Sequence, residues 1–278
     1  MDRYAVMGNP VSHSKSPLIH SAFAKQCNQS LSYEAIHVEA EGFASAVSSF
    51  FKQGGSGLNI TLPFKQEAWA QADDRSADAE LAGAVNTLWQ DSQGRLQGHN
   101  TDGIGLLRDI KINHTGSLKN KKVLLLGAGG AARGIIAPLL REEPAELCIA
   151  NRTYTKAAWL ATLFASYGNV SACELEALKG KQVDWVINAS SASLQGELPP
   201  LPNDLLKAGA ACYDLMYGDG ETVFCQWSRQ AGAEKIMDGL GMLVEQAAES
   251  FFLWRGIRPQ TASVIKSLRQ VGQRLPIL

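Results

Sequence analysis

Short apolar runs alternate with amphipathic helical patterns along most of the chain. Apolar runs bounded by turn-forming residues are typical of buried strands, whereas apolar positions spaced by three and four residues are typical of helices. In the first third, the pattern predicts strands at Tyr4–Met7, Ser32–Val38 and Gly57–Ile60, with helices at Pro17–Cys27 and Glu41–Gln53. This alternation predicts an α/β architecture with parallel strands.

A β-hairpin is expected next, because Val85–Trp89 and Arg95–Gln97 flank a polar turn that ends in Gly94. The segment Asn113–Asn120 is polar and lacks periodicity, which is typical of a boundary region. We place the division between two domains near residue 103.

A second α/β alternation begins at Val123. It predicts a helix that ends at about Arg141 and these further elements: strands Val123–Leu126, Glu146–Ala150, Val183–Asn188 and Ala211–Leu215, and helices Tyr154–Tyr167, Leu240–Trp254 and Thr261–Leu275. The last two helices are separated by Arg255–Pro259. The sequence does not show which domain these helices cover.

Composition narrows the classes of protein. The 278 residues are 45% hydrophobic and 19% charged, with a formal net charge of −1, as in an ordinary globular protein. A nucleic-acid or membrane partner would call for a basic excess, so we expect neither. The apolar stretch Val123–Leu140 contains several glycines and Arg133, which argues against a membrane span, and the first residues lack a signal-peptide layout.

The five cysteines are far apart and never form a C-x-x-C pair: Cys27, Cys148, Cys173, Cys212 and Cys225. This spacing argues against a disulfide framework and against a metal site, and it fits a cytoplasmic protein. We interpret most of them as small buried hydrophobic residues.

A glycine-rich turn follows the strand that ends at Leu126. Its residues are Gly127, Ala128, Gly129, Gly130, Ala131 and Ala132, in the pattern G-x-G-x-x-A. Between a strand and a helix, this pattern permits a tight turn, close approach of a pyrophosphate and close packing of helix on sheet. The alternative is a glycine-rich turn that binds no ligand. The strand–turn–helix context favours a dinucleotide site.

The end of the next strand indicates which dinucleotide is bound. An NAD site usually has an acidic residue there, but this chain has Asn151, Arg152 and Thr153, followed by Lys156. A guanidinium can form a forked, charge-assisted contact with a 2′-phosphate. NADP is therefore the expected cofactor, and the alternative is an arginine that is simply solvated.

Polar residues gather in apolar surroundings in the first domain. The motifs that contain them are Ser14-Lys15-Ser16-Pro17, Asn59-Ile60-Thr61-Leu62-Pro63-Phe64-Lys65, Gly83-Ala84-Val85-Asn86-Thr87 and Asn100-Thr101-Asp102-Gly103. Singly, the serines could be a helix cap, Lys65 a surface charge and Asp102 a helix N-cap. Together they match ketone reduction, which needs a proton donor and several neutral groups that orient a polyol.

The chain resembles the shikimate dehydrogenase family over nearly its whole length. The resemblance rests on the motifs above, on Gly127–Ala132 and Asn151-Arg152-Thr153, and on Asp238-Gly239-Leu240-Gly241-Met242-Leu243-Val244-Glu245-Gln246-Ala247. It implies reversible NADPH-dependent reduction of 3-dehydroshikimate to shikimate, within aromatic amino-acid biosynthesis. It also implies a substrate domain of residues 1–103 plus about 256–278, a Rossmann-type NADP domain of residues 104–255, and a site between the two.

The resemblance also implies roles for individual residues. Lys65 and Asp102 are the catalytic pair, with the Lys65 ammonium giving a proton to the developing alkoxide. Ser14 and Ser16 bind the substrate carboxylate, with Tyr217 at the same end. The hydroxyl contacts are Asn59, Thr61, Asn86 and Gln246. Besides the glycine-rich turn and the Asn151–Lys156 region, the cofactor contacts are Ser190, Leu215 and Gly239.

Two departures from the family pattern concern the cofactor side. Asp219 stands where proline is frequent, and Ser190 and Ala192 stand where threonine and glycine are common. Three alternatives also stay open. They are a quinate/shikimate dehydrogenase that uses NAD or NADP, a related oxidoreductase such as one acting on folates, and a non-catalytic NADP-binding sensor. The small-molecule enzyme is expected to be a monomer or a homodimer.

Overall fold

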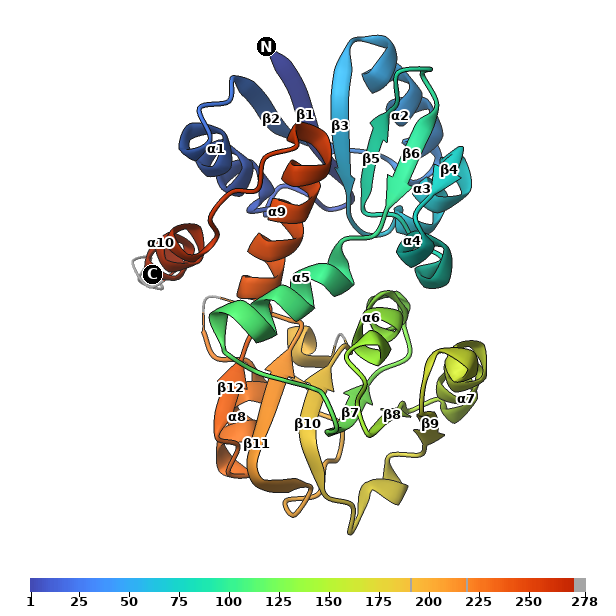
Figure 1. Ribbon diagram of the computed structural model, residues 1–278, viewed down its shortest axis with the longest axis vertical. Coiled ribbons are helices and arrows are strands. Elements are labelled where there is room, and N and C mark those ends of the chain that lie inside the picture. Colours follow the sequence, from blue (N-terminus) through green and yellow to red (C-terminus); the bar gives the residue numbers. More distant parts are fainter. Residues whose placement is uncertain (191, 219, 273–278) are drawn as a thin grey trace. The chain divides into compact units, whose positions relative to one another are not determined.

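The computed structural model describes residues 1–190, 192–218 and 220–272, and the chain forms two compact units (Figure 1). The first unit contains Met1–Gly105 and Leu243–Lys266. The second contains Leu106–Met242 and Ser267–Leu278. Each unit is built on its own six-stranded sheet. The chain is therefore a two-unit α/β protein, as the alternation of elements predicts.

The sheet of the first unit is mixed, in the order β2-β1-β3-β5-β6-β4. Its strands are β1 (Asp2–Gly8), β2 (Leu31–His37), β3 (Gly55–Ile60), β4 (Asp74–Arg75), β5 (Thr87–Gln90) and β6 (Leu96–His99). Strands β1, β2 and β3 are parallel, and β5 and β6 form the predicted antiparallel hairpin. The parallel strands and the hairpin of this domain are therefore confirmed.

The helices of the first unit cover this sheet. They are α1 (Ser16–Gln26), α2 (Phe43–Lys52), α3 (Lys65–Gln71) and α4 (Ala77–Ala82), with the 3-10 turn η1 (Ala40–Gly42) before α2. The rings of Phe43 and Phe64 stack 4.8 Å apart in the core between α2 and the sheet. Because Phe64 is fully buried directly before Lys65, the start of α3 is fixed against the core.

Helix α9 (Leu240–Arg255) packs against the first unit from Leu243 onward. The Trp254 ring stacks on Tyr4 at 4.7 Å, and a Cβ at Gly57 would lie 2.6 Å from the Trp254 indole nitrogen. Residues 243–255 therefore group with the first unit, whereas the sequence assigned them to the dinucleotide domain. Their apolar spacing predicts a helix but cannot show which sheet it covers.

The sheet of the second unit is parallel throughout, in the order β12-β11-β10-β7-β8-β9. Its strands are β7 (Lys122–Leu126), β8 (Glu146–Ala150), β9 (Val170–Cys173), β10 (Val183–Asn188), β11 (Leu206–Asp214) and β12 (Lys235–Met237). This is the doubly wound order in which ligands bind outside the carboxyl ends of the strands, where the order reverses between β7 and β10.

The connecting helices of the second unit follow the parallel strands. They are α6 (Gly130–Arg141), α7 (Tyr154–Phe164) and α8 (Val223–Gln230), with the short turns η3 (Ala165–Tyr167), η4 (Glu176–Leu178) and η5 (Ala192–Gln195). The predicted helix Tyr154–Tyr167 thus ends as a 3-10 turn. Strand β11 begins before its predicted start at Ala211.

The chain passes from one unit into the other three times. The first passage is through α5 (Asp102–Arg108), which continues as the π-helical turn η2 (Asp109–Asn113). The expected boundary segment 113–120 lies inside the second unit, because Leu118 is buried there and Trp185 donates a hydrogen bond to the Ser117 carbonyl. The unit boundary at Gly105 lies close to residue 103.

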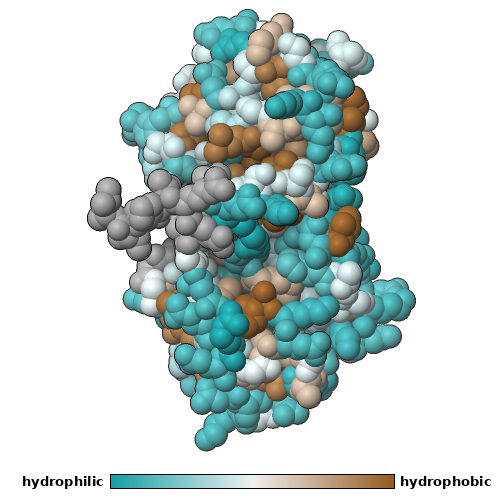
Figure 2. Space-filling view, turned by 90° about the vertical axis from the view of Figure 1, so that its left-hand side faces the viewer, coloured by the Kyte–Doolittle hydropathy of each residue, from teal (hydrophilic) through white to brown (hydrophobic). Residues whose placement is uncertain are grey.

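The last helix is α10 (Ala262–Gly272), and the predicted residues 273–275 lie outside the described part of the chain. The chain groups with the first unit as far as Lys266 and with the second unit from Ser267, where Arg269 pairs with Asp238. The predicted return of residues 256–278 to the first domain therefore ends at Lys266. None of the described helices is long and apolar enough to cross a membrane. On the face shown in Figure 2, hydrophilic residues predominate and hydrophobic residues form small patches.

His20 of α1 provides a test of the core of the first unit. Its ring is 1% exposed and stacks on Tyr33 at 4.2 Å, and burial lowers the pKa of His20 to about 3. An unfolded histidine takes up a proton near pH 6.5, so the unfolded state gains protons first as the pH falls. Stability that is present above pH 6.5 is therefore lost progressively down to about pH 3.

We expect His20→Phe to remove this acid sensitivity. Urea unfolding should show that the stability difference between wild type and variant changes by about 1.5 kcal/mol between pH 6.5 and pH 5. Replacing the exposed His13 with Gln is the control and should leave the pH dependence as it is in the wild type. An unchanged pH dependence in His20→Phe would contradict the neutral, buried state of His20.

Candidate active site

An ion pair joins the starts of two helices in the first unit. Lys65 is the first residue of α3 and Asp102 the first residue of α5, and Lys65 Nζ lies 2.7 Å from Asp102 Oδ2. Their side chains are 25% and 13% exposed. Lys65 is therefore no solvated surface charge, and the pair remains within reach of a small ligand.

The Asp102 carboxylate is held on both of its oxygens. Lys65 takes Oδ2, and Asn86 Nδ2 donates to Oδ1 at 2.9 Å. The Asp102 amide donates to the Asn100 side chain at 3.0 Å, and Asp102 is the first residue of α5 and not its N-cap. The carboxylate is thus directed toward the lysine, and charge-assisted hydrogen bonds of this kind are strong and directional.

Asn86 links this pair to α9. Its Oδ1 accepts from the Thr101 amide at 2.9 Å, and its Nδ2 lies 3.3 Å from Gln246 Oε1. Gln246 Oε1 also accepts from the Thr101 hydroxyl at 3.3 Å. The structure therefore brings Lys65, Asn86, Asp102 and Gln246 together, although the sequence spreads them over most of the chain.

Asn59 lies deeper, under the same network, and is 6% exposed. Its Oδ1 accepts from the Tyr33 hydroxyl at 2.7 Å, and its Nδ2 donates to Ser250 Oγ at 2.9 Å. Burial raises the pKa of the Tyr33 phenol, which keeps this donor protonated. The Asn59 amide is committed to protein partners, so its contact with a ligand stays a prediction.

The predicted carboxylate site lies at the start of α1. Ser14 Oγ accepts from the amide of Ser16, the first residue of α1, at 3.3 Å. Ser16 is buried at 7% exposure, whereas Ser14 is partly exposed. Thr61 lies at the end of β3, where its methyl group would be 2.3 Å from a Cβ at Gly8. Glycine at position 8 therefore makes room for Thr61.

The glycine-rich turn of the second unit follows β7. Gly127 has a φ of +105°, and a Cβ there would lie 3.0 Å from the Ser190 amide nitrogen. By contrast, a Cβ at Gly129 or Gly130 would meet no atom within 4 Å. Helix α6 begins there with no side-chain cap on its amide groups. The turn thus presents an open surface with free donors, as phosphate binding requires.

Asn151, Arg152, Thr153 and Lys156 lie in the loop and first turn after β8. The Asn151 side chain donates to the Thr153 carbonyl at 2.9 Å and fixes the loop. Arg152 and Lys156 are exposed, and neither forms an ion pair within the described residues. This loop and the first turn of α7 (Tyr154–Phe164) therefore present two exposed cations.

A buried polar pair ties together the ends of β10 and β11. Asn188 Nδ2 donates to Asp214 Oδ1 at 3.0 Å, and Ser190 Oγ donates to Asn188 Oδ1 at 2.7 Å. Burial raises the pKa of Asp214, and Thr222 donates to its second oxygen at 2.7 Å. This network fixes Ser190 beside Gly127.

Leu215 and Gly239 meet through their backbones. A Cβ at Gly239 would lie 2.0 Å from the Leu215 carbonyl oxygen, so the chain needs glycine there. Tyr217 is half-buried in the same unit, and burial raises the pKa of its phenol. Asp219 lies outside the described residues.

The sequence did not identify the residues whose hydrogen bonds fix the predicted site residues in place. These are Tyr33, Thr87 and Ser250 in the first unit, and Asn188 and Asp214 in the second. Ser250 had a signal, since it follows Gln246 by one helical turn. No sequence feature predicted the role of Tyr33, because nothing in the sequence places β2 near Asn59.

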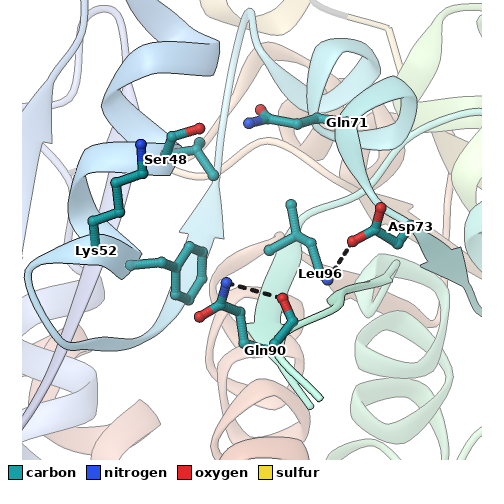
Figure 3. A pocket seen from close by; sticks show the side chains of 9 residues that line it. Ser48, Lys52, Gln71, Asp73, Gln90 and Leu96 are labelled. Atoms are coloured by element: carbon teal, nitrogen blue, oxygen red, sulfur yellow. Dashed lines mark hydrogen bonds between the residues drawn. The ribbon is translucent and has the colours of Figure 1, made fainter. Parts of the chain in front are cut away.

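A separate cavity of about 360 Å³ lies in the first unit (Figure 3). Its lining comes from α2, the end of α3 and the hairpin, and includes none of the predicted site residues. Two of its polar side chains bind backbone groups of the protein: Gln90 donates to the Gly94 carbonyl within the hairpin, and Asp73 accepts from the Leu96 amide. We therefore assign no ligand to this cavity.

Gly129 offers a test of the glycine-rich turn. Because its φ is −90° and space around it is open, Gly129→Ala should leave the melting temperature of the free protein unchanged. It should weaken NADP binding on the order of tenfold, because the methyl group occupies the approach of the pyrophosphate. Calorimetric titration with NADP measures this. Gly127→Ala is the comparison and should lower stability as well; unchanged affinity in Gly129→Ala would favour a turn without a ligand.

Comparison with known families and structures agrees with this arrangement. Residues 6–88 match the shikimate dehydrogenase substrate binding domain, residues 109–195 match shikimate / quinate 5-dehydrogenase, and residues 239–269 match the shikimate 5'-dehydrogenase C-terminal domain. The matched segments include the ion pair's lysine, the glycine-rich turn and Gln246.

Known relatives match over nearly their full length. The chain is 57% identical to a shikimate dehydrogenase (NADP(+)) of Alkalilimnicola ehrlichii, covering 96% of this chain and 98% of that protein. It is 55% identical to the same enzyme of Cellvibrio japonicus, covering 97% of each chain.

Two solved structures are also similar. A Thermus thermophilus shikimate 5-dehydrogenase in complex with NADP(H) and shikimate has a TM-score of 0.86 at 35% identity, covering 97% of this chain and 99% of that one. An Ael1 enzyme from Pseudomonas putida has a TM-score of 0.92 at 49% identity, covering 96% and 98%. The chain belongs to the shikimate dehydrogenase family.

Proposed function

We propose that the protein catalyses the reversible reduction of 3-dehydroshikimate to shikimate with NADPH. The observation that carries the proposal is the ion pair of Lys65 and Asp102, at 2.7 Å and partly open to solvent. A ketone that gains hydride at carbon needs a proton at oxygen, and an ammonium group beside it can supply one. The family match supplies the substrate class.

In the forward direction, the Lys65 ammonium donates its proton to the oxygen of the reacting ketone as that oxygen becomes an alkoxide. In the reverse direction, neutral Lys65 takes the proton of the hydroxyl. Asp102 holds the amine in place through the 2.7 Å contact. Asn86 keeps the carboxylate from turning away, because it occupies the other carboxylate oxygen.

The remaining polar residues of the first unit orient the ring. We assign the substrate carboxylate to Ser14 and Ser16, with Tyr217 at the same end, and the ring hydroxyls to Asn59, Thr61, Asn86 and Gln246. Ser14 and Thr61 are partly exposed and can turn toward a ligand. Asn59 acts mainly by fixing the Asn86 backbone, to which its amide donates at 3.2 Å.

The second unit fits NADP. The open surface at Gly129 and Gly130 and the start of α6, which has no side-chain cap, match a pyrophosphate. The exposed cations Arg152 and Lys156 match a 2′-phosphate. We further assign Gly127, Ala128, Ala131, Asn151, Thr153, Ser190, Leu215 and Gly239 to the cofactor site. When bound, NADPH would supply the hydride.

A cytoplasmic location is part of the proposal, because all five cysteines are free thiols and four of them are buried. We propose a monomer or a homodimer. The family description includes quinate. Initial rates with quinate and with NAD therefore measure how strongly the enzyme prefers shikimate over quinate and NADP over NAD. A non-catalytic sensor would not need the Lys65–Asp102 pair.

The central test is Lys65→Ala. We expect kcat for shikimate oxidation to fall roughly 10²- to 10⁴-fold with little change in substrate affinity, because the proton-transfer group is lost and the orienting groups remain. Absorbance of the reduced nicotinamide measures the rate. Lys52→Ala, which removes an exposed lysine of α2, should leave the rate unchanged. Near-native turnover of Lys65→Ala would contradict the assignment of Lys65 as the proton-transfer group.

Arg152→Ala tests the cofactor preference. The loss of one charge-assisted contact should lower the preference for NADP over NAD by about 10- to 100-fold, with kcat for NAD hardly changed. Parallel kcat/KM measurements with both cofactors give the ratio. Equal losses for NADP and NAD would place Arg152 away from the 2′-phosphate.

A further inference from the structure

Two cysteines meet on neighbouring strands of the second unit. Cys148 lies on β8 and Cys173 is the last residue of β9, and their sulfur atoms are 3.3 Å apart. Lys181 Nζ lies 3.9 Å from Cys148 Sγ. A sulfur pair at this distance, with a cation beside it, is a dithiol rather than two separate core residues.

The surroundings make one sulfur reactive. The hydrogen bond with Cys173 and the charge of Lys181 lower the pKa of the Cys148 thiol, against the opposing effect of burial. The same hydrogen bond and burial raise the pKa of Cys173. The thiolate is the nucleophile in sulfur oxidation, and a thiol held beside it can resolve the oxidised sulfur.

The pair lies next to the edge of the sheet, and both residues are buried, at 5% and 7% exposure. Strand β9 is at the edge of the sheet and has four residues. Leu178 of η4 belongs to the same core cluster as the two cysteines. Short elements at a sheet edge open locally at low free-energy cost, and such an opening would admit a small oxidant to the sulfurs.

The dithiol is coupled to the cofactor loop through the strand register. Cys148 lies opposite Ser171, and Cys173 lies opposite Ala150, so the two cysteines are diagonal neighbours. Strands lie about 4.8 Å apart and rise about 3.3 Å per residue, so diagonal neighbours on parallel strands have Cα atoms about 8 Å apart. A disulfide spans Cα atoms about 4.4–6.8 Å apart. Closure of the bridge must therefore shift the ends of β8 and β9. Arg152 follows Ala150 by two residues.

We propose that Cys148 and Cys173 form a redox-active dithiol that a peroxide converts to a disulfide, with loss of NADP affinity. The Cys148 sulfur attacks one peroxide oxygen, the O–O bond breaks, and a sulfenic acid and one water form. The Cys173 sulfur then attacks the sulfenic sulfur, the S–S bond forms and a second water leaves. Two thiols are oxidised and one peroxide is reduced. A strained bridge of this kind is easily reduced again by a thiol.

The test uses the full chain and hydrogen peroxide. Before oxidation, the reduced protein is shown to oxidise shikimate with NADP, so failure of the proposed function is seen separately. After treatment, peptide mapping should find Cys148 linked to Cys173 with the loss of two hydrogen atoms. Calorimetric titration should show NADP binding weakened about 10- to 100-fold, as expected for the loss of one charge-assisted contact. Dithiothreitol should restore the affinity.

Three variants serve as controls. Cys148→Ser and Cys173→Ala should each keep their NADP affinity after peroxide and form no bridge. Cys225→Ser removes a buried cysteine of the same unit, where burial raises the pKa to about 11, and should respond like the wild type. Circular dichroism melting curves verify that each variant is folded. A linkage through another cysteine, oxidation that stops at Cys148 alone, or a bridge that leaves NADP affinity unchanged would overturn the proposal.

Discussion

The bond between the Lys65 amine and the Asp102 carboxylate is the constraint on which the site of the first unit depends. A partly desolvated ion pair is stable only if its remaining donors and acceptors also find partners. The fold meets this need with neutral groups: Asn86 binds the second carboxylate oxygen, and Thr101 and Gln246 surround Asn86. Because these groups are uncharged, they orient the carboxylate without competing for the lysine.

The second unit depends on close backbone approaches. Gly127 and Gly239 each touch the backbone of another loop, so neither position has room for a side chain. Asn188 and Asp214 add buried hydrogen bonds between the ends of β10 and β11. The strand ends are thereby fixed, while Gly129 and Gly130 stay open. The turn is therefore rigid at Gly127 and still leaves room for a pyrophosphate at Gly129 and Gly130.

The sequence predicts the elements well where periodicity is strong, as in β1, α1, β7 and α9. It misses β9, whose four residues lie at a sheet edge and show no apolar run, and α8, whose buried Phe224 and Trp227 are three residues apart. It also assigns residues 243–255 of α9 to the dinucleotide domain, although they group with the first unit, because periodicity shows that a face is buried but not what covers it.

The candidate site shows the same limit. Motifs locate Lys65, Asn86 and Asp102, but their meeting depends on sheet order and helix starts that only the folded chain has. The supporting layer of Tyr33, Thr87 and Ser250 has ordinary residue types, and its role arises from packing alone. In the second unit, the glycine pattern predicts the turn, whereas the Asn188–Asp214 bond beneath it has no local motif.

A crystal structure of the protein with both shikimate and NADP bound tests the central claim most directly. The account predicts that Lys65 Nζ lies within about 3 Å of the shikimate hydroxyl oxygen that is attached to the carbon that exchanges hydride. Asp102 should still be bound to the Lys65 amine. A ring whose reacting oxygen contacts neither Lys65 nor Asp102 would contradict it.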